Sequence, residues 1–140
     1  LITVFAILLA VGPQLYTYWN VRAITNSNVK ADGSYVGLLV SINTDSAKRV
    51  RSCGSRANPH LLAALHDSMR FAAAHVLLTE INEKSFRIDK GEWNHMRVTL
   101  WADGRVDFHP EQSNDLVNYW TARLSLDGAR KAEQTAWLQK

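Results

Sequence analysis

The chain has 140 residues, 46% apolar and 21% charged, and its 16 Lys and Arg exceed its 13 Asp and Glu to give a net charge of +3. This composition excludes collagen-like, low-complexity and wholly disordered chains, and the length accommodates one domain. The single cysteine, Cys53, excludes an internal disulfide framework and a cysteine-rich zinc module.

The first twelve residues, LITVFAILLAVG, form an uncharged apolar run that ends before Pro13. A helix over residues 1–19 would be about 28 Å long, close to the hydrocarbon thickness of a bilayer. We therefore expect residues 1–22 to be a transmembrane or filament-core anchor helix, with a buried core helix as the alternative. The residues expected at the membrane interface are Tyr16, Tyr18, Trp19 and Arg22.

The start of the chain also resembles a known family. The run AILLAVG, then Pro13, Leu15, Tyr16 and Tyr18, is similar to the N-terminal helix of type IV pilin-like subunits, which bends at a proline and continues through aromatic residues. The resemblance covers residues 1–19 and implies a pilin-like filament subunit. The chain has Phe5 where such subunits usually carry Glu, and it has one cysteine in place of their C-terminal pair, so no functional residue is carried over.

The next segments predict a linker, a strand, a basic loop and a long helix. Residues 23–33 are mostly polar and indicate a linker, whereas residues 34–43 alternate in the manner of a buried strand. Residues 44–58 hold four bases and one acid and favour a loop. Asn58 and Pro59 are typical of a helix start, and an apolar stripe predicts a helix over 59–82.

The last part of the chain predicts an antiparallel sheet followed by two helices. We expect strands over 85–89, 93–101 and 106–109, with a hairpin turn at Asp103-Gly104. Helices should follow from Ser113 and again after Gly128. The fold class is therefore α+β, with a hydrophobic N-terminal helix followed by a small antiparallel sheet packed by helices. The predicted divisions are an anchor helix over 1–22, a linker over 23–33 and a head domain over 34–140.

Two features of the head favour contacts with other proteins. Residues 20–58 hold six bases and two acids, whereas residues 59–140 hold ten bases and eleven acids, so the positive charge lies close to the first helix. A strand over 93–101 would place two tryptophans on one face, where they could anchor a partner or stack on a ligand. The residues proposed for partner binding are Arg49, Arg51, Arg56, Trp93, Arg97 and Trp101.

The sequence contains no strong catalytic motif. Cys53 is flanked by Arg51 and Arg56, which would favour a thiolate, but no family-specific pattern surrounds it. The histidines do not have the spacing of a metal-binding helix, and no phosphate-binding glycine loop is present. We assign no catalytic residue, no metal ligand and no cofactor. The histidines considered are His60, His66, His75, His95 and His109.

The sequence favours a non-catalytic, membrane-anchored structural or assembly subunit that binds other protein subunits through its head. This hypothesis places the chain at a membrane and does not favour a nucleic acid or a small-molecule ligand as partner. Two alternatives stay open. One is a pilin-like filament subunit, and the other is a small enzyme or ligand-binding module that uses Cys53 or the histidines.

Overall fold

The computed structural model describes residues 2–34, 37–83, 88–89 and 91–138, with side chains of the first helix described from residue 11 onward. Helices and strands are mixed along the chain, and the strands form two small antiparallel sheets. The elements in the first half are α1 (Ile2–Arg22), η1 (Asn26–Asn28), β1 (Val29–Ser34), β2 (Gly37–Ile42), α2 (Asp45–Cys53), η2 (Gly54–Ala57) and α3 (Asn58–Ala64). Those in the second half are α4 (Phe71–Asn82), β3 (Ile88–Asp89), β4 (Glu92–Trp93), β5 (Met96–Leu100), β6 (Val106–Phe108), η3 (Pro110–Gln112) and α5 (Ser113–Leu138).

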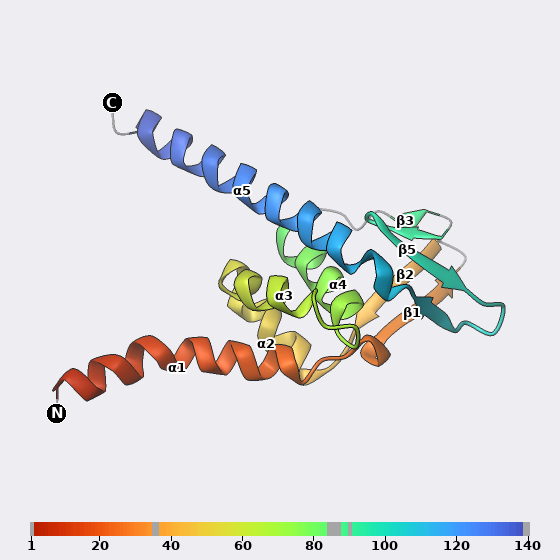
Figure 1. Ribbon diagram of the computed structural model, residues 1–140, viewed down its shortest axis with the longest axis horizontal. Helices are drawn as coiled ribbons and strands as arrows, with labels where there is room; N and C mark the ends of the chain where they lie inside the picture. Colours follow the sequence, from red (N-terminus) through yellow and green to blue (C-terminus); the bar gives the residue numbers. More distant parts are fainter. Residues whose placement is uncertain (1, 35–36, 84–87, 90, 139–140) are drawn as a thin grey trace.

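The sheets lie at one end of the molecule and two long helices extend from the other (Figure 1). β1 pairs with β2, and a second sheet has the order β3-β4-β5-β6. α1 and α5 both run toward the same side, so the two chain ends lie on that side. The α+β architecture is therefore a helical body that carries two projecting helices and a pair of small sheets.

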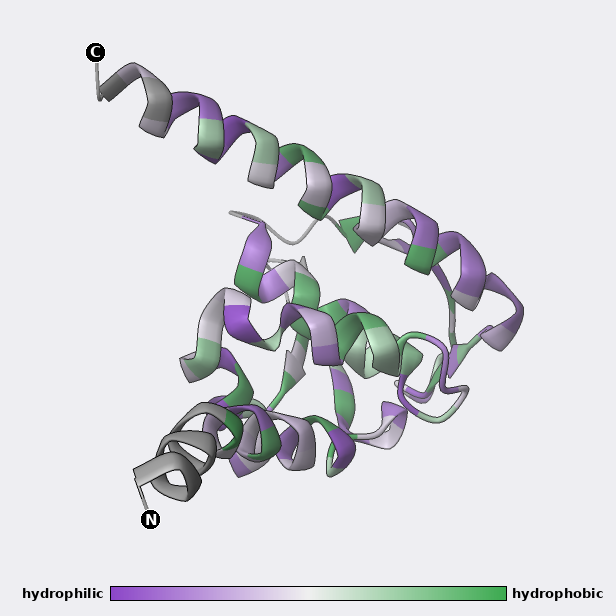
Figure 2. Cartoon of the chain, turned by 60° about the vertical axis from the view of Figure 1, so that its left-hand side comes forward, coloured by the Kyte–Doolittle hydropathy of each residue, from purple (hydrophilic) through white to green (hydrophobic). Residues whose placement is uncertain are grey.

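Helix α4 is the centre of the hydrophobic core. All nine residues from Phe71 to Thr79 are buried, because α2, α3, η1 and β2 pack around this helix. Ala72, Ala73 and Ala74 leave room for these neighbours to approach closely. Figure 2 shows the hydrophobic colouring gathered in the helices at the centre of the molecule, whereas α5 alternates between hydrophilic and hydrophobic residues. The sequence prediction of helix is confirmed over Phe71–Asn82, but residues 71–79 are buried on every side and not along a single stripe.

The prediction of a transmembrane helix in the fold is wrong. Among the residues that the structure describes, no helix combines the length and the apolar character that a membrane crossing needs. The apolar run stops at Pro13 and Gln14, and twelve helical residues reach only about 18 Å of the roughly 30 Å required. The rest of α1 packs against α2 and α3 instead of continuing as an apolar rod.

The predicted basic loop over 44–58 is also wrong, because most of it is helix α2. The hydroxyl of Thr44 accepts a hydrogen bond from the backbone N–H of Ala47 at 3.1 Å and caps the helix start. Ala47 and Val50, three positions apart, bury the inner face of the helix. Gly54 ends it with a φ of 57°, a conformation that favours glycine.

Three other boundaries differ from the sequence prediction. The expected linker over 23–33 contains most of β1, which pairs with β2 from Val29↔Ile42 to Ser34↔Gly37. The expected helix over 59–82 is split into α3 and α4, since the carboxylate of Asp67 accepts from the N–H of Met69 in a turn between them. The two expected C-terminal helices are one, α5. Residues 84–87 of the expected strand over 85–89 lie outside the described residues.

Candidate protein-binding surface

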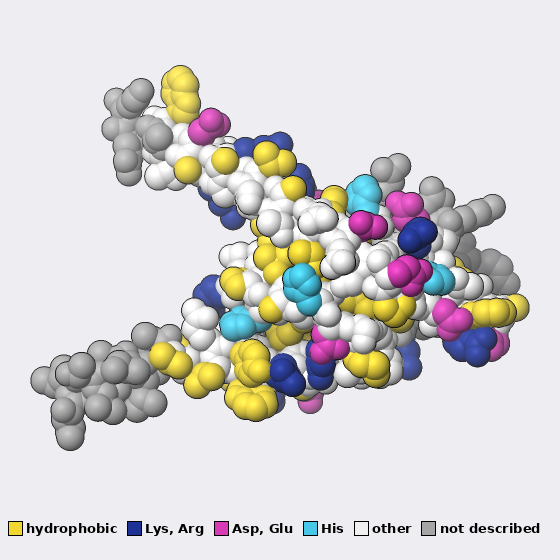
Figure 3. Space-filling view, viewed as in Figure 1, with side chains coloured by type: hydrophobic (Ala, Val, Ile, Leu, Met, Phe, Trp, Pro, Cys, Tyr) yellow, Lys and Arg dark blue, Asp and Glu magenta, His cyan; other side chains and the backbone are white. Residues whose placement is uncertain are grey.

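Helix α1 exposes large apolar side chains and buries two polar ones, with Val21 as its buried apolar residue among the described side chains. Within its described side chains, Trp19 is 64% exposed and Leu15 is 51% exposed, whereas Thr17 and Asn20 are only 4% and 8% exposed. The large apolar side chains that face outward are Val11, Leu15, Tyr16, Tyr18 and Trp19, and we call them the α1 apolar face. Figure 3 shows hydrophobic side chains gathered along this helix, beside basic ones. A surface helix normally places such residues against the core.

The buried polar side chains of α1 are satisfied within the helix itself. The amide of Asn20 donates to the carbonyl of Tyr16 at 2.8 Å, and the hydroxyl of Thr17 lies 2.9 Å from the carbonyl of Pro13. Because these groups keep hydrogen bonds, their burial against α2 and α3 costs little. Polar residues at these two positions can therefore face the body without destabilising the fold.

The end of α1 is fixed to the body by hydrogen bonds. The guanidinium of Arg70 donates to the carbonyl of Arg22 at 3.1 Å. The side chain of Asn26 donates to the carbonyl of Ser68 at 2.8 Å and accepts from the N–H of Ala72, the second residue of α4, at 3.0 Å. These contacts hold the helix in one orientation, so the α1 apolar face stays directed outward.

The aromatic residues of the face are also ordered by one another. Tyr18 packs edge-on against Trp19, with ring centroids 5.4 Å apart, and against His60 at 6.2 Å. Arg22 donates to the Tyr18 hydroxyl at 3.1 Å and lies over its ring, 5.5 Å from the centroid. Ordered Trp, Tyr and Arg side chains are the residues that contribute most binding energy at protein interfaces.

The surroundings of the α1 apolar face are positively charged. The first 31 residues contain no Asp or Glu. Arg22 on α1, Arg49 on α2 and Arg56 on η2 are all exposed. A surface that binds here must therefore combine apolar residues with negative charge.

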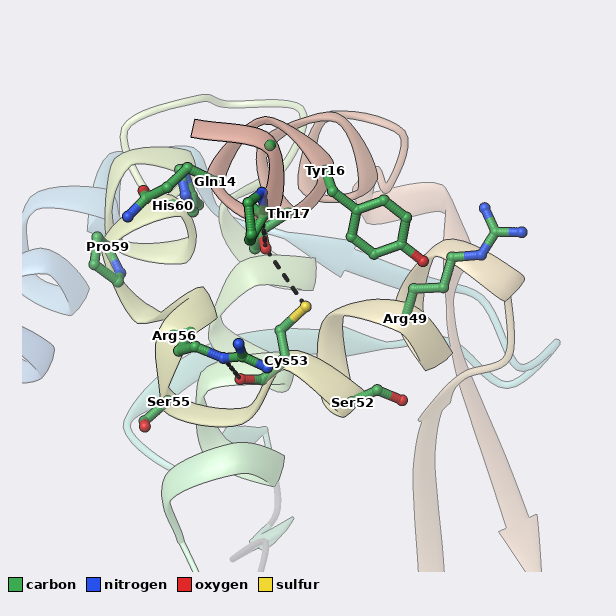
Figure 4. A pocket seen from close by; sticks show the side chains of 12 residues that line it. Gln14, Tyr16, Thr17, Arg49, Ser52, Cys53, Ser55, Arg56, Pro59 and His60 are labelled. Atoms are coloured by element: carbon green, nitrogen blue, oxygen red, sulfur yellow. Dashed lines mark hydrogen bonds between the residues drawn. The ribbon is translucent and has the colours of Figure 1, made fainter. Parts of the chain in front are cut away.

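A groove of about 660 Å³ lies between α1 and the segments α2, η2 and α3, beside their direct contacts (Figure 4). Cys53, at the end of α2, directs its Sγ toward α1, where it lies 3.4 Å from the Thr17 hydroxyl. Arg56 lies beneath Cys53 and donates through Nε to its carbonyl at 3.4 Å, and Arg49 lies beside Tyr16 at one end. His60 reaches the groove from the other end. We call this the α1–α2 groove.

The structure separates the arginines that the sequence grouped in one basic loop. Arg49 and Arg56 line the α1–α2 groove. Arg51 turns toward the body, where it pairs with Glu80 at 2.8 Å and donates to the carbonyl of Ile42. α2 is a helix, so residues two apart point in different directions. Arg51 therefore stabilises the contact between α2 and α4, and its side chain, 32% exposed, is only partly accessible for the predicted partner binding.

The predicted face shared by Trp93 and Trp101 does not form. A tight turn at Asn94 and His95, with φ of 46° and 77°, divides the expected strand, so Trp93 pairs across it with Met96. Trp93 is buried, whereas Trp101 is exposed and its indole N–H donates to Asp107 at 2.7 Å. Arg97 is exposed on β5. Arg97 and Trp101 are therefore available at the surface, but Trp93 is part of the core.

The hairpin between β5 and β6 is confirmed, with pairing from Val98↔Phe108 to Leu100↔Val106. Its loop is longer than a two-residue turn. The N–H of Trp101 donates to the carbonyl of Arg105, and the N–H of Gly104 donates to the carbonyl of Trp101. Gly104 has a φ of 83°, as the left-handed position of such a loop requires. The guanidinium of Arg105 lies 4.8 Å from the Trp101 ring.

The histidines are dispersed, and His75 belongs to the core. The Trp120 indole N–H donates to His75 Nδ1 at 2.9 Å, so the ring carries its proton on Nε2 and donates it to the Trp93 carbonyl at 3.0 Å. Burial lowers the pKa of His75 to about 4, which keeps the ring neutral. Among the described residues, no group of three or more His, Cys, Asp or Glu side chains converges as metal ligands would.

Comparisons of the chain with family models, with curated proteins and with solved structures give no match. The resemblance of residues 1–19 to type IV pilin-like subunits therefore stays a prediction.

The four residues expected at a membrane interface, Tyr16, Tyr18, Trp19 and Arg22, are all exposed on α1. The sequence predicted which residues matter but not which way they point. The spacing of Leu15, Trp19 and Arg22 places them on one side of a helix, but it does not show which side packs against the body.

Proposed function

We propose that this chain is a non-catalytic assembly subunit that binds a partner protein on the α1 apolar face. The partner surface it fits is an apolar stripe bordered by carboxylates. The exposed apolar residues of α1 carry this proposal, because a well-anchored helix leaves Trp19 and Leu15 exposed. Contiguous exposed apolar residues of this kind mark interaction sites on protein surfaces.

A partner protein accounts for the face better than a second copy of this chain. A two-fold contact through α1 would bring Arg22, Arg49 and Arg56 of both copies into one interface. Like charges at an interface are unfavourable, and Asp67, the acid that interacts with Arg22, is already paired with Arg70. A different protein can supply the carboxylates that these arginines need.

The order within the face supports a protein in preference to a lipid surface. Arg22 holds Tyr18 by a hydrogen bond at 3.1 Å, and Tyr18 in turn holds Trp19 edge-on. Pre-ordered aromatic side chains lose little entropy when they enter fixed pockets, which a protein partner offers. Interfacial binding to a lipid surface relies instead on buried apolar area and diffuse charge attraction.

Site-specific photo-crosslinking tests this function in the native host cells. A benzoylphenylalanine residue replaces Trp19 in the full chain, and the adducts formed on irradiation are mapped by mass spectrometry. We expect one discrete protein adduct, whose contact peptide has an apolar stripe next to Asp or Glu. Leu15→Glu in the same chain should abolish the adduct, because a carboxylate at the centre of the face opposes apolar contact and repels the acidic border.

Leu126 provides the matched control, since it is an exposed leucine on α5, away from α1. Benzoylphenylalanine at position 126 should not give the same adduct, and Leu126→Glu should leave the position-19 adduct intact. The proposal fails if position 19 crosslinks only to lipid or only to a second copy of the chain. It also fails if the adduct persists in the Leu15→Glu variant.

A further inference from the structure

The α1–α2 groove lies beside the α1 apolar face and shares Tyr16 with it. It runs on the side of α1 that faces the body, and neither Leu15 nor Trp19 lines it. Its volume of about 660 Å³ is in the range of pockets that bind small molecules. Variants at Leu15 and Trp19 therefore test the apolar face, whereas the reactivity of Cys53 tests the groove.

The groove carries cationic groups without carboxylates. No Asp or Glu is among the described residues that line it. The Arg56 guanidinium makes one long hydrogen bond, to the Cys53 carbonyl at 3.4 Å, and no ion pair or hydrogen bond of the Arg49 side chain is formed with another described residue. By contrast, Arg51 and Arg123 are paired with Glu80 and Glu83 at 2.8 Å and 3.0 Å. Guanidinium groups left in this state favour a carboxylate or phosphate.

The remainder of the lining combines apolar surface with the polar side chains of Gln14, Thr17 and His60. Pro13 and Gly12 come from α1, Pro59 from α3, and the Tyr16 ring closes the end beside Arg49. The hydroxyls of Ser52 and Ser55 add hydrogen-bond donors on the α2 and η2 side. A small inorganic anion would leave the apolar lining uncovered, whereas an uncharged apolar molecule would leave the guanidinium groups without a partner.

We propose that the α1–α2 groove binds a small amphiphilic anion, a carboxylate or phosphate attached to an apolar chain. The anionic head lies against Arg56 and the serine hydroxyls near Cys53, with Arg49 adding positive charge from the end of the groove. The apolar chain covers Pro13, Pro59 and the Tyr16 ring. The ligand is a free molecule, and anionic lipid vesicles provide the comparison that distinguishes it from a lipid in a bilayer.

Alkylation of Cys53 reports directly on this groove, because it is the single cysteine of the chain and its Sγ points into the site. The uncharged reagent iodoacetamide is added to the full chain, and the modification rate is followed by mass spectrometry. Decanoate and decyl phosphate, each below its micelle concentration, should slow the reaction in a saturable manner. Inorganic phosphate and 1-decanol should slow it much less at equal concentration.

The variant Arg49→Gln/Arg56→Gln removes both guanidinium groups and should weaken protection by decanoate about tenfold or more. The control variant Arg97→Gln/Arg105→Gln makes the same change in charge on β5 and its hairpin. Decanoate should protect Cys53 in this variant as well as it does in the unmodified chain. Circular dichroism and the alkylation rate without ligand show whether each variant keeps its fold.

Four results would overturn the proposal. The first is an alkylation rate that neither decanoate nor decyl phosphate changes. The second is equal protection by 1-decanol, which would remove the anion from the ligand class, and the third is equal protection by inorganic phosphate, which would remove the apolar chain. The fourth is protection by anionic lipid vesicles but not by the free amphiphiles, which would make the bilayer the source.

Discussion

Helices α1 and α5 extend from the body toward the same side, yet they pack by opposite rules (Figure 1). α5 buries Leu116 and Trp120 completely, with Val117 and Leu124 half-buried on the same face, and it turns Asn114 outward. α1 buries Thr17 and Asn20 together with Val21, and it turns its aromatic residues outward. The apolar face of the packed part of α5 is buried within this chain. By contrast, α1 packs through one face and leaves its apolar face exposed to another molecule.

The first prediction separates the two tryptophans that typify these helices. Trp120→Ala should lower the free energy of unfolding by about 3–5 kcal/mol, because it opens a cavity against α4. It also removes the hydrogen bond to His75 Nδ1. Trp19→Ala should change the same quantity by less than about 0.5 kcal/mol, since its ring is exposed. Urea denaturation of both variants measures the difference, and similar losses would show that α1 and α5 contribute alike to the core.

The second prediction concerns the histidine that connects α5 to α4. Burial lowers the pKa of His75 from 6.5 to about 4. Between these pH values the unfolded chain binds a proton that the folded chain excludes, so stability falls as pH falls through this window. The loss reaches about 3 kcal/mol.

Denaturation of His75→Gln over the same window isolates this contribution. Gln keeps one donor and one acceptor but does not titrate, so its stability should depend less steeply on pH between about 6.5 and 4. His66→Gln is the matched control, because it makes the same replacement at an exposed histidine. Equal slopes for the unmodified chain and His75→Gln would contradict a neutral buried ring.

The third prediction measures the α1 apolar face in binding. Trp19→Ala should weaken the complex with the crosslinked partner by about 2 kcal/mol or more, roughly 30-fold in Kd. Leu126→Ala should leave Kd unchanged. Titration calorimetry of the purified proteins gives both values, and raised salt should weaken binding further by screening Arg22 and Arg49. An unchanged Kd for Trp19→Ala would remove this residue from the interface.

Sequence patterns predicted the elements whose own residues decide their structure. The β5–β6 hairpin follows from Asp103-Gly104, and the buried face of α5 follows from the spacing of Leu116 and Trp120. α2 was missed because only Ala47 and Val50 mark its inner face among basic and polar residues. A helix this short depends on tertiary packing for its stability, which local patterns do not report.

The candidate site was predictable in its residues but not in its geometry. Tyr18, Trp19 and Arg22 stand out in the sequence, but the burial of Thr17 and Asn20 depends on where α2 and α3 pack. The α1–α2 groove joins residues about forty positions apart, and no motif links them. Trp93 was misplaced because the turn at Asn94 and His95 uses positive φ at two residues other than glycine, which a strand pattern does not anticipate.

The smallest expected effect concerns the projecting half of α5. Gly128 lies within this helix, and a Cβ built there meets no described atom within 4 Å. Gly128→Ala should favour the helical state by about 1 kcal/mol, because alanine loses less conformational freedom than glycine. Hydrogen exchange of amides near residue 128 should slow by up to about fivefold, with no change at the buried amides of α4. The solvated end of α5 should therefore become more stable without any change in the stability of α4. Slower exchange in both helices would instead show that the projecting half of α5 opens together with the core.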